Sequence, residues 1–429
     1  MKDKKLNILA ALLLLTLGLP LKAQEGQLGF TPYSILGIGD IANKGTAYNA
    51  AMAGIGVADR NVRALNLINP AAVTARDSKS FIMDFGVENR NQVFYQDDMK
   101  SANNSFNMHH VAASFPIYKN SAFKLGITPY STVEYSFTER DTREEIMAEL
   151  GDVRYAHTGK GHIYNVFLGA GATFWNRLSV GVDGQYYFGS ITKLINTSFS
   201  TATNYRNIKV GYRDLVSAFG VKFGLQYTQP FSASKELNIG ATYSISSKLK
   251  SGRLEYAYGI ASSATDTIYQ TKSNISLGTI PAELAVGISY REKDKWMIGF
   301  DYARQDWRNS NMISTPGVDF QPTVSNSFRL GMEITPNRYD VRYFFKRWTY
   351  RAGVYRNYTY VSLNGNQVVA TGFTLGMGIP VFRYYNAINL GVDIGQKGSL
   401  VDSNVRERYA MITLSFNLHD IWFIKPMYN

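Results

Sequence analysis

Cysteine is absent from this chain of 429 residues. A disulfide-stabilised scaffold is therefore excluded, and so is membrane attachment through a lipidated cysteine. Long apolar runs are also missing, because the longest, Ile8 to Leu19, falls short of the roughly 20 residues that a membrane-spanning helix requires. Proline is scarce, with 12 residues, and only 18% of residues are charged. These absences leave a soluble protein or a membrane protein built from β-strands.

The short apolar run has the features of an N-terminal secretion signal. Lysines at positions 2, 4 and 5 precede it, and the small-residue site Leu21-Lys22-Ala23 follows it. A basic start, an apolar centre and a small-residue end are the three parts of a signal peptide. An N-terminal core helix is the alternative, but nothing amphipathic flanks the run. We therefore predict a signal peptide over residues 1–23 and export from the cytoplasm.

Aromatic residues and glycine are abundant in the chain, which contains 29 tyrosines, 24 phenylalanines and 37 glycines. Tyrosine and phenylalanine at this density suit a surface that meets two membrane–water interfaces. The formal net charge is +12. Nucleic acid is not expected as a partner of an exported protein. The positive charge therefore indicates either contact with the headgroups of outer-membrane lipid and lipopolysaccharide or simple solubility.

From residue 79 onward, apolar residues recur with a period of two. In residues 387–395, Ile388, Leu390, Val392 and Ile394 alternate with polar or small residues. Successive side chains of a strand point to opposite faces, so one face of each such strand is apolar. A soluble β-sandwich alternates in the same way, so the period predicts strands without deciding between a sandwich and a membrane barrel.

The lengths of the connections distinguish these two folds. Short turns are predicted near 118–121, 175–177, 230–235, 291–295 and 381–386, with a longer one near 336–346. They alternate with longer polar stretches near 90–104, 138–158, 190–206, 248–270, 306–324, 359–366 and 396–405. Short periplasmic turns and long extracellular loops are typical of a transmembrane barrel, whose closed ladder pairs every backbone group. We predict an all-β, antiparallel, multi-pass barrel of about 14 strands in the cell outer membrane.

Glycines and charges gather on the face opposite the apolar rows. The glycines are Gly181, Gly224, Gly287, Gly299, Gly331, Gly376, Gly378 and Gly391. The charged residues are Asp84, Glu88, Asp183, Asp301, Arg329, Glu333, Arg351 and Asp393. A strand glycine marks either a bend or the close approach of another backbone. Because unpaired buried charge is costly, we expect these charges to pair with one another or with a segment inside the barrel.

Residues 24–78 precede the first strand and are too few to form a core of their own. Residues 47–57, AYNAAMAGIGV, are rich in small side chains and lack a period of two, which suits compact structure in a confined space. In the following stretch LNLINPAA, Asn69 is a good helix N-cap and Pro70 suits the first helical position. We predict a short helix over residues 70–75 that ends a plug. An ordinary surface turn is the alternative.

A Gly/Ala-rich N-terminal segment, an NPA sequence and about 14 strands together resemble the FadL family of outer-membrane transporters for long-chain fatty acids and other hydrophobic compounds. Residues 45–75 carry the sequence resemblance. It implies a hatch over residues 24–78 inside a barrel over residues 79–429, with Asn69-Pro70-Ala71 as the hatch motif. It also implies a lumen pocket for a hydrophobic, fatty-acid-like ligand and a lateral exit at a kinked third strand.

The third predicted strand contains Gly126 and Pro129. Proline cannot donate to the ladder, so Pro129 indicates either a lateral gate in the wall or only the rim of the barrel. The basic residues of the next long loop are Arg140, Arg143, Arg154 and Lys160. They are candidates for contacts with a ligand carboxylate or with lipid phosphates, and a solvated loop charge is the alternative for each.

Catalytic and metal-binding chemistry is not expected. The five histidines are His109, His110, His157, His162 and His419. The spacing of His157 and His162 is poor for a metal pair, and the adjacent His109 and His110 would face opposite sides of a strand. A nucleophile elbow and a strand–loop–helix nucleotide site are both lacking. We therefore expect no enzyme, no metal and no cofactor.

Three functions are compatible with this reading. The first is transport of a hydrophobic molecule, such as a long-chain fatty acid, by a monomeric barrel. The second is a protein-binding shuttle component of a secretion system on the same fold, or a structural outer-membrane barrel. The third is a general porin, against which a filled lumen argues. A cavity large enough for an acyl chain would favour transport, whereas a lumen packed solid would favour the shuttle.

Overall fold

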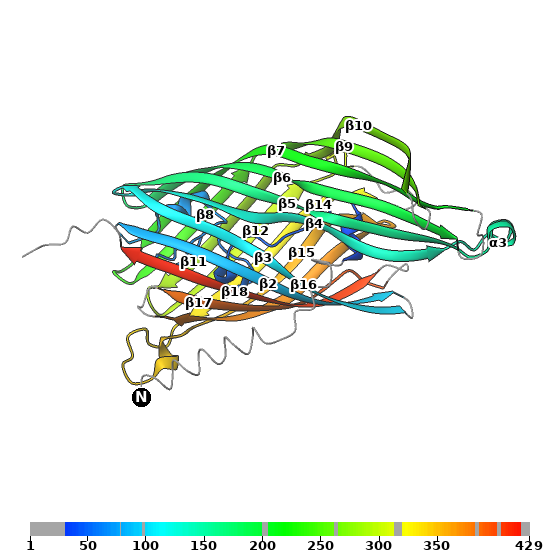
Figure 1. Ribbon diagram of the computed structural model, residues 1–429. Coiled ribbons are helices and arrows are strands. Elements are labelled where there is room, and N and C mark those ends of the chain that lie inside the picture. Colours follow the sequence, from blue (N-terminus) through cyan, green and yellow to red (C-terminus); the bar gives the residue numbers. More distant parts are fainter. Residues whose placement is uncertain are drawn as a thin grey trace, which may run out of the picture.

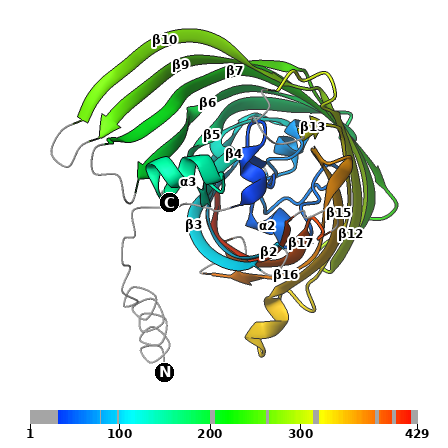
Figure 2. The same cartoon turned by 90° about the vertical axis from the view of Figure 1, so that its right-hand side faces the viewer.

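The computed structural model describes residues 31–421 except 78, 97–98, 200–204, 261–264, 313–319, 382–385 and 401–404. Its antiparallel strands close into a barrel, because the last strand pairs with the first wall strand, and a segment of chain lies inside it (Figures 1 and 2). The predicted signal peptide lies outside the described residues. No helix in the described part of the chain is both long and apolar enough to span a membrane.

Fourteen strands form the wall, as the sequence predicts. Eleven of them are uninterrupted: β2 (Ser80–Gln96), β3 (Met99–Tyr118), β4 (Ser121–Arg140), β5 (Val153–Phe174), β6 (Leu178–Phe199), β7 (Asn207–Pro230), β12 (Trp296–Asp306), β15 (Thr349–Leu363), β16 (Asn366–Pro380), β17 (Ala387–Lys397) and β18 (Arg406–Ile421). Each of the other three consists of two segments: β8 (Lys235–Ser244) with β9 (Ser247–Ile260), β10 (Thr265–Ile280) with β11 (Glu283–Glu292), and β13 (Phe320–Pro322) with β14 (Val324–Ile334).

The apolar rows of the strands face outward. On β11, Leu284, Val286 and Ile288 are 52%, 43% and 45% exposed, whereas Ala285 between them is buried. A sandwich would bury such rows between its two sheets, so their exposure requires a lipid environment. The closed barrel with an apolar outer surface is an outer-membrane barrel, as predicted.

Several stretches that the sequence predicts as loops are strand, which corrects that part of the prediction. β6 runs through most of 190–206, and β9 and β10 occupy most of 248–270. Residues 265–274 of β10 are all exposed, so both faces of this strand end are wet and neither needs apolar side chains. Figure 2 shows β9 and β10 flaring away from the barrel axis at the end that carries α3 (Glu144–Leu150).

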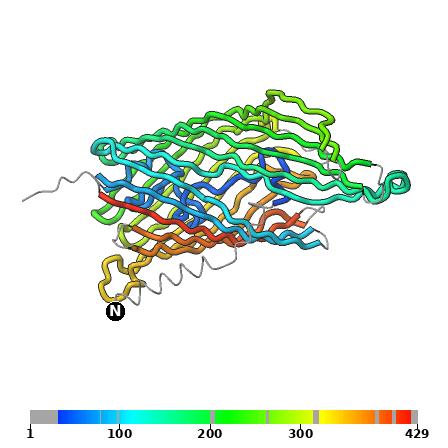
Figure 3. Tube along the Cα trace, in the orientation of Figure 1, coloured from blue at the N-terminus to red at the C-terminus, as the bar shows by residue number. Residues whose placement is uncertain are grey.

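The chain inside the barrel is the predicted hatch. It contains η1 (Pro32–Ile35), β1 (Asp40–Ile41), α2 (Ala47–Ala50) and η2 (Pro70–Thr74), which lie within the ring of strands (Figure 3). Small buried residues such as Ala47 and Ala51 let it approach the wall closely. The hatch therefore supplies the packed interior of the barrel.

Wall glycines give the hatch its room, as the close-approach interpretation predicts. A Cβ atom added to Gly331 would lie 2.6 Å from the carbonyl oxygen of Met52, and one added to Gly181 would lie 2.6 Å from the amide nitrogen of Ala71. Added Cβ atoms would also meet the hatch at Gly224, Gly287, Gly299, Gly376 and Gly391. Gly378 differs, because its neighbours are Arg351 and Asn389 of the wall.

Candidate functional site

The NPA sequence fastens the hatch to the wall. Pro70–Thr74 forms the predicted short helix, and the side chain of Asn69 caps it by accepting a hydrogen bond of 3.0 Å from the amide of Ala71. The same side chain donates to the carbonyl oxygens of Val57, at 2.7 Å, and of Leu225 in β7, at 3.2 Å. Asn69 is fully buried. The side-chain amide of Asn69 thus links η2 and the hatch segment around Val57 to strand β7 of the wall.

Ion pairs hold the hatch at a second level of the lumen. Lys44 pairs with Glu283 of β11, and Asp40 pairs with Lys397 of β17 and with Arg90 of β2, the latter at 3.3 Å. Burial acts to raise the pKa of Asp40, but the two cations outweigh it and hold that pKa below its ordinary value. Asp40 is therefore an anion at neutral pH.

The inward charges of the wall pair with the hatch or with one another, as predicted. Asp301 accepts hydrogen bonds from the amides of Gly56 and Val57, at 2.7 and 2.9 Å. Arg291 bridges Asp59 of the hatch, at 2.6 Å, and Glu333 of β14, at 2.8 Å. Two further acids of the predicted set, Asp183 and Asp393, bond to Lys124 and Tyr355 of the wall. These contacts tie the hatch to the wall and pair charged groups within the lumen.

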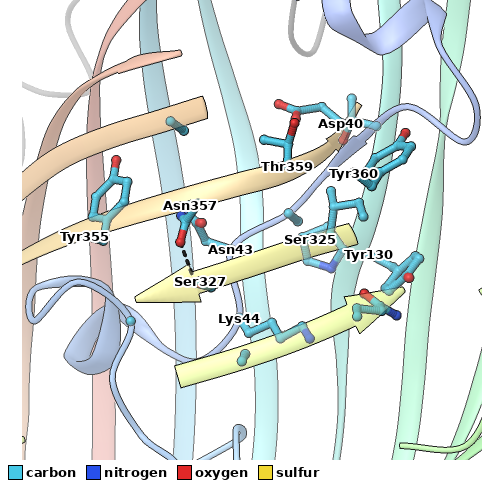
Figure 4. Close-up of a pocket in the computed structure, with 18 of the residues that line it drawn as sticks. Asp40, Asn43, Lys44, Tyr130, Ser325, Ser327, Tyr355, Asn357, Thr359 and Tyr360 are labelled. Carbon is cyan, nitrogen blue, oxygen red and sulfur yellow. Dashed lines mark hydrogen bonds between the residues drawn. The ribbon is translucent and has the colours of Figure 1, made fainter. Parts of the chain in front are cut away.

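A cavity of about 260 Å³ remains between the hatch and the wall. Figure 4 shows Asp40 and Lys44 of the hatch beside Tyr130, Tyr355 and Tyr360 of the wall in this cavity. Its lining mixes aromatic rings with charged groups, most of which are already paired. The cavity therefore offers apolar contact together with polar anchors, which is typical of a small-molecule site.

Two charged residues that line the cavity, Lys222 and Arg304, form no hydrogen bond or ion pair with the described residues, and of these two only Lys222 is buried. Lys222 belongs to β7 and is 5% exposed. A buried cation without a bonded partner is costly, so a ligand anion would be favoured next to it. Lys222 is therefore the residue of this cavity best suited to bind a carboxylate or a phosphate.

The wall is open on one side of the cavity. β3 and β4 pair from Tyr118 and Ser121 only as far as Val111 and Ile127. Beyond this point the described residues of the two strands form no pairs with each other, although β3 continues along β2 and β4 continues along β5. Instead, β1 of the hatch pairs with the released edge of β4, at Ser131 and Thr132. The cavity reaches this break, because Met108 and Tyr130 line it.

The two residues predicted for a lateral gate lie where the ladder ends. Gly126 forms one of the last β3–β4 pairs, with Ala112. Pro129 lies beside a register shift between itself and Ser131 in the β4–β5 ladder, and it lines the cavity. Their role in a lateral gate stays a prediction and is taken up below as a proposal.

Three of the basic residues predicted to contact headgroups lie next to α3, at the end of the barrel that carries the long loops. Arg140 and Arg154 both pair with Asp152, at 2.7 Å each, and Arg143 pairs with Asp141 at 2.6 Å. The hydrogen bonds from Arg143 also hold the pKa of Asp141 well below its usual range. Each of these three guanidinium groups therefore has a carboxylate partner, although Arg140 and Arg154 share one, so this cluster keeps a net positive charge.

Lys160, the fourth predicted headgroup residue, lies apart from these pairs. It is an exposed residue of β5 and forms no ion pair with the described residues. Of the four candidates it alone has no carboxylate partner among the described residues.

One prediction about the histidines was wrong. His109 and His110 do not face opposite sides of β3, because the β2–β3 register shifts between Gly86 and Val87 and inserts an extra residue. Both rings are buried, with their Nδ1 atoms 2.8 Å apart, and His110 Nε2 lies 2.8 Å from Asp84 Oδ1. Across the part of the chain that the structure describes, no group of three or more His, Asp or Glu residues is arranged to hold a metal ion.

The residues that define the cavity could not be identified from the sequence. Lys222 looks like one more polar residue of an alternating strand, and its isolation depends on neighbours far away in the chain. Lys44 and Glu283 pair across 239 residues of sequence. The only local signals that pointed here are the NPA cap and the proline in β4.

Solved structures with a similar fold are outer-membrane channels. A CymD monoaromatic hydrocarbon channel superposes with a TM-score of 0.58 at 16% identity, covering 87% of this chain and 97% of that one. A Pseudomonas aeruginosa FadL homologue gives 0.57 at 10% identity, covering 90% and 100%. The P. putida toluene transporter TodX gives 0.56 at 13% identity, covering 89% and 100%. The resemblance to FadL-type barrels is therefore confirmed as a likeness of fold.

Sequence comparison supplies the family. A search of curated proteins finds no match. The BamG family profile, in contrast, matches residues 4–429, which is nearly the whole sequence. The chain therefore belongs to the BamG family.

Proposed function

We propose that this barrel is an outer-membrane transporter for small hydrophobic molecules that carry an anionic group, and that it is not an enzyme. The ligand occupies the lumen cavity and leaves sideways through the break between β3 and β4. The observation that carries this proposal is that the cavity and the break are continuous. Met108, Pro129 and Tyr130, which flank the end of the β3–β4 ladder, are also part of the cavity lining.

The cavity supplies one anchor of each kind that such a ligand needs. The ammonium group of Lys222 attracts the anion, and the rings of Tyr130, Tyr355 and Tyr360 contact the apolar part. Lys44 is unsuited to the first role, because Glu283 already neutralises it. The ammonium group of a lysine is a point charge that lacks the rigid two-pronged geometry of a guanidinium group, so it can bind a carboxylate or a phosphate in several orientations.

The size of the cavity favours a small ligand. Its volume of about 260 Å³ lies just under the roughly 300–1,000 Å³ that is usual for ligand pockets. A long-chain fatty acid therefore fits only if β1 moves away from β4, whereas a monocyclic acid fits without such movement. The names of two similar structures, a monoaromatic hydrocarbon channel and a toluene transporter, support a ligand of this smaller size.

Mass spectrometry of molecules retained by the purified barrel tests ligand binding. We expect a hydrophobic acid in a fixed ratio to the protein, retained by Lys222→Arg and lost from Lys222→Gln. Lys248→Gln, which removes an exposed lysine of β9, is the matched control. Retention that is unchanged in Lys222→Gln would refute the role of this residue.

A disulfide between the hatch and the wall tests the lateral route. Ile41 and Ser131 face each other across the β1–β4 pair, and the bond from Ala42 N to Tyr130 O shows that they are a non-hydrogen-bonded pair. Such pairs have Cα atoms about 4.5 Å apart, within the range that a disulfide spans. The chain has no other cysteine. We expect Ile41→Cys with Ser131→Cys to stop uptake of a labelled ligand when oxidised and to restore it when reduced; unchanged uptake in the oxidised form would exclude this route.

A protein-binding role is the second candidate, and one observation favours it. Thr265–Asn274 of β10 pairs on one side with β9, and its other edge pairs with no strand among the described residues. An exposed strand edge is a template for an added strand. Chemical cross-linking from a cysteine at Gln270 distinguishes the two roles, because a shuttle would yield a protein adduct and a transporter would not.

A further inference from the structure

The loop between β14 and β15 exposes an unusual number of aromatic and basic side chains. This interfacial loop comprises residues 335–348 and includes the short helix η3 (Phe344–Arg347). Its large exposed apolar residues are Tyr339, Val341, Tyr343, Phe344 and Phe345, and Val341 is 96% exposed. An apolar cluster of this size in water would be unfavourable, so its surroundings must be something other than bulk solvent.

The interfacial loop is ordered by its own hydrogen bonds. The amide of Asn337 donates to the carbonyl of Lys346 at 2.8 Å and closes the base of the loop. The Oδ1 atom of Asp340 accepts from the amides of Arg342 and Tyr343, at 2.9 and 2.6 Å. At the side nearest the lumen, Arg338 pairs with Asp294 at 3.1 Å. The exposed side chains are therefore presented by a fixed backbone.

The direction of the interfacial loop places it at the membrane surface. Figures 1 and 2 agree that this segment, drawn in gold, projects sideways from the wall at the end with the short turns, rather than along the barrel axis. Its aromatic rings lie next to the outer surface of the wall, because the ring centroids of Trp348 and of Tyr350, an outward residue of β15, are 6.4 Å apart. A sideways projection at the periplasmic end lies along the inner leaflet of the outer membrane.

Its charges match the headgroups of that leaflet. The interfacial loop carries Arg338, Arg342, Lys346 and Arg347 against the single acid Asp340. Arg342 and Lys346 lie over the ring of Tyr343, at 5.1 and 4.8 Å, and Arg347 lies over Phe344 at 4.6 Å. Among the described residues, Arg342 and Arg347 form no ion pair. Basic side chains layered on aromatic rings are typical of segments that lie in a lipid interface.

We propose that the interfacial loop is a membrane anchor that binds anionic phospholipid headgroups of the periplasmic leaflet. Val341, Phe344 and Phe345 enter the boundary between headgroups and acyl chains, and Arg342 and Arg347 contact the phosphates. The anchor fixes the rotation and depth of the barrel, because it extends from one side of the wall only. This inference does not depend on the transported ligand.

Fluorescence quenching tests the depth of the interfacial loop. Val341→Cys, labelled with an environment-sensitive dye, is placed in vesicles of phosphatidylcholine with and without phosphatidylglycerol. We expect quenching by brominated lipid and protection from iodide in both, with greater protection when phosphatidylglycerol is present. Ser234→Cys, in an exposed turn at the same end of the barrel, is the control. Strong quenching by iodide at position 341 would overturn the proposal, as would shielding from both quenchers that requires a co-purifying protein.

Native mass spectrometry tests the charges. The ratio of retained phosphatidylglycerol to phosphatidylcholine should fall about fivefold for each of Arg342→Gln and Arg347→Gln, since each basic residue near a membrane surface carries that much preference. Arg308→Gln, which removes an exposed arginine just after β12 that pairs with Asp306, should leave the ratio unchanged. Because both loop residues lie outside the wall, shifted migration on unheated gels confirms that the variants are folded. An unaltered ratio in folded Arg342→Gln with Arg347→Gln would overturn the headgroup assignment.

Discussion

Replacing Gly224 by alanine should release the hatch while the wall stays intact. The added Cβ would lie 2.7 Å from Pro70 Cδ and 2.8 Å from Ala71 N, and closer still to Asn69 Oδ1. Real Cβ contacts are no shorter than about 3 Å, and neither the proline ring nor the backbone can turn aside, so η2 must move inward. That movement also breaks the bonds that Asn69 donates to the carbonyl oxygens of Leu225 and Ala241 in the wall.

The magnitude follows from these two effects. Overpacking of a rigid site costs about 1–3 kcal/mol. Loss of the buried hydrogen bonds of Asn69 adds roughly 1–3 kcal/mol. A total of about 3 kcal/mol would raise the population with a released hatch by roughly 100-fold, since each 1.4 kcal/mol is a factor of ten.

Hydrogen exchange followed by mass spectrometry measures this release. The amides of residues 47–74 should exchange roughly 100-fold faster in Gly224→Ala. Trypsin should also cut after Arg60 and Arg63, which are partly buried while the hatch is docked. Gly184→Ala is the matched control, because its Cβ on the outer face of β6 would meet nothing nearer than Leu168 O at 3.8 Å. Wild-type exchange in a folded Gly224→Ala barrel would refute the idea that the glycine rows exist to seat the hatch.

Three further outcomes follow from the same contacts. Asp301→Ala leaves the buried amides of Gly56 and Val57 without an acceptor, so hatch docking measured by hydrogen exchange should weaken by roughly 2–5 kcal/mol, and Asp301→Asn should recover part of this. Because the pKa of Asp40 is lowered in the docked state, its ion pairs stabilise docking at pH values above the ordinary carboxyl pKa of about 3.9. This contribution is lost as the pH falls through the lowered pKa, so hydrogen exchange at residues 38–42 should rise in acid. Asp40→Asn should remove that rise. Asn69→Ala should cost roughly 2–4 kcal/mol in the same assay through loss of the cap and of its bond to Val57, and Asn69→Asp should keep the cap alone.

The wall was predictable because its physics is local. Each membrane strand must alternate in polarity, so rows such as Ile388 to Ile394 reveal both the strand and its outer face. The prediction was wrong where that constraint ends, as in residues 265–274 of β10, which are wet on both faces. The cap at Asn69 was predictable for the same reason, since it acts within three residues.

The site was not predictable because it is assembled from distant parts of the chain. The pairing of β1 with β4 joins Ile41 to Ser131, and no local pattern marks a strand of two residues. The bulge that buries His109 with His110 depends on a register shift between two whole strands. Where the ladder between β3 and β4 stops is likewise a property of the closed barrel, and Pro129 in β4 is a local feature near it.

The distribution of contacts decides which part of the hatch can move. Residues 47–74 lie against the glycine rows and are held by Asp301, Arg291 and Asn69, so their release breaks many buried contacts at once. β1 is held by a two-residue ladder with β4 and by the largely buried ion pairs of Asp40, so its release breaks fewer contacts but separates buried charges. Because β1 also covers the edge of β4 beside the cavity, its movement would uncover the lateral break while residues 47–74 stay in place. The lateral route proposed above therefore requires β1 to move and leaves the contacts of residues 47–74 intact.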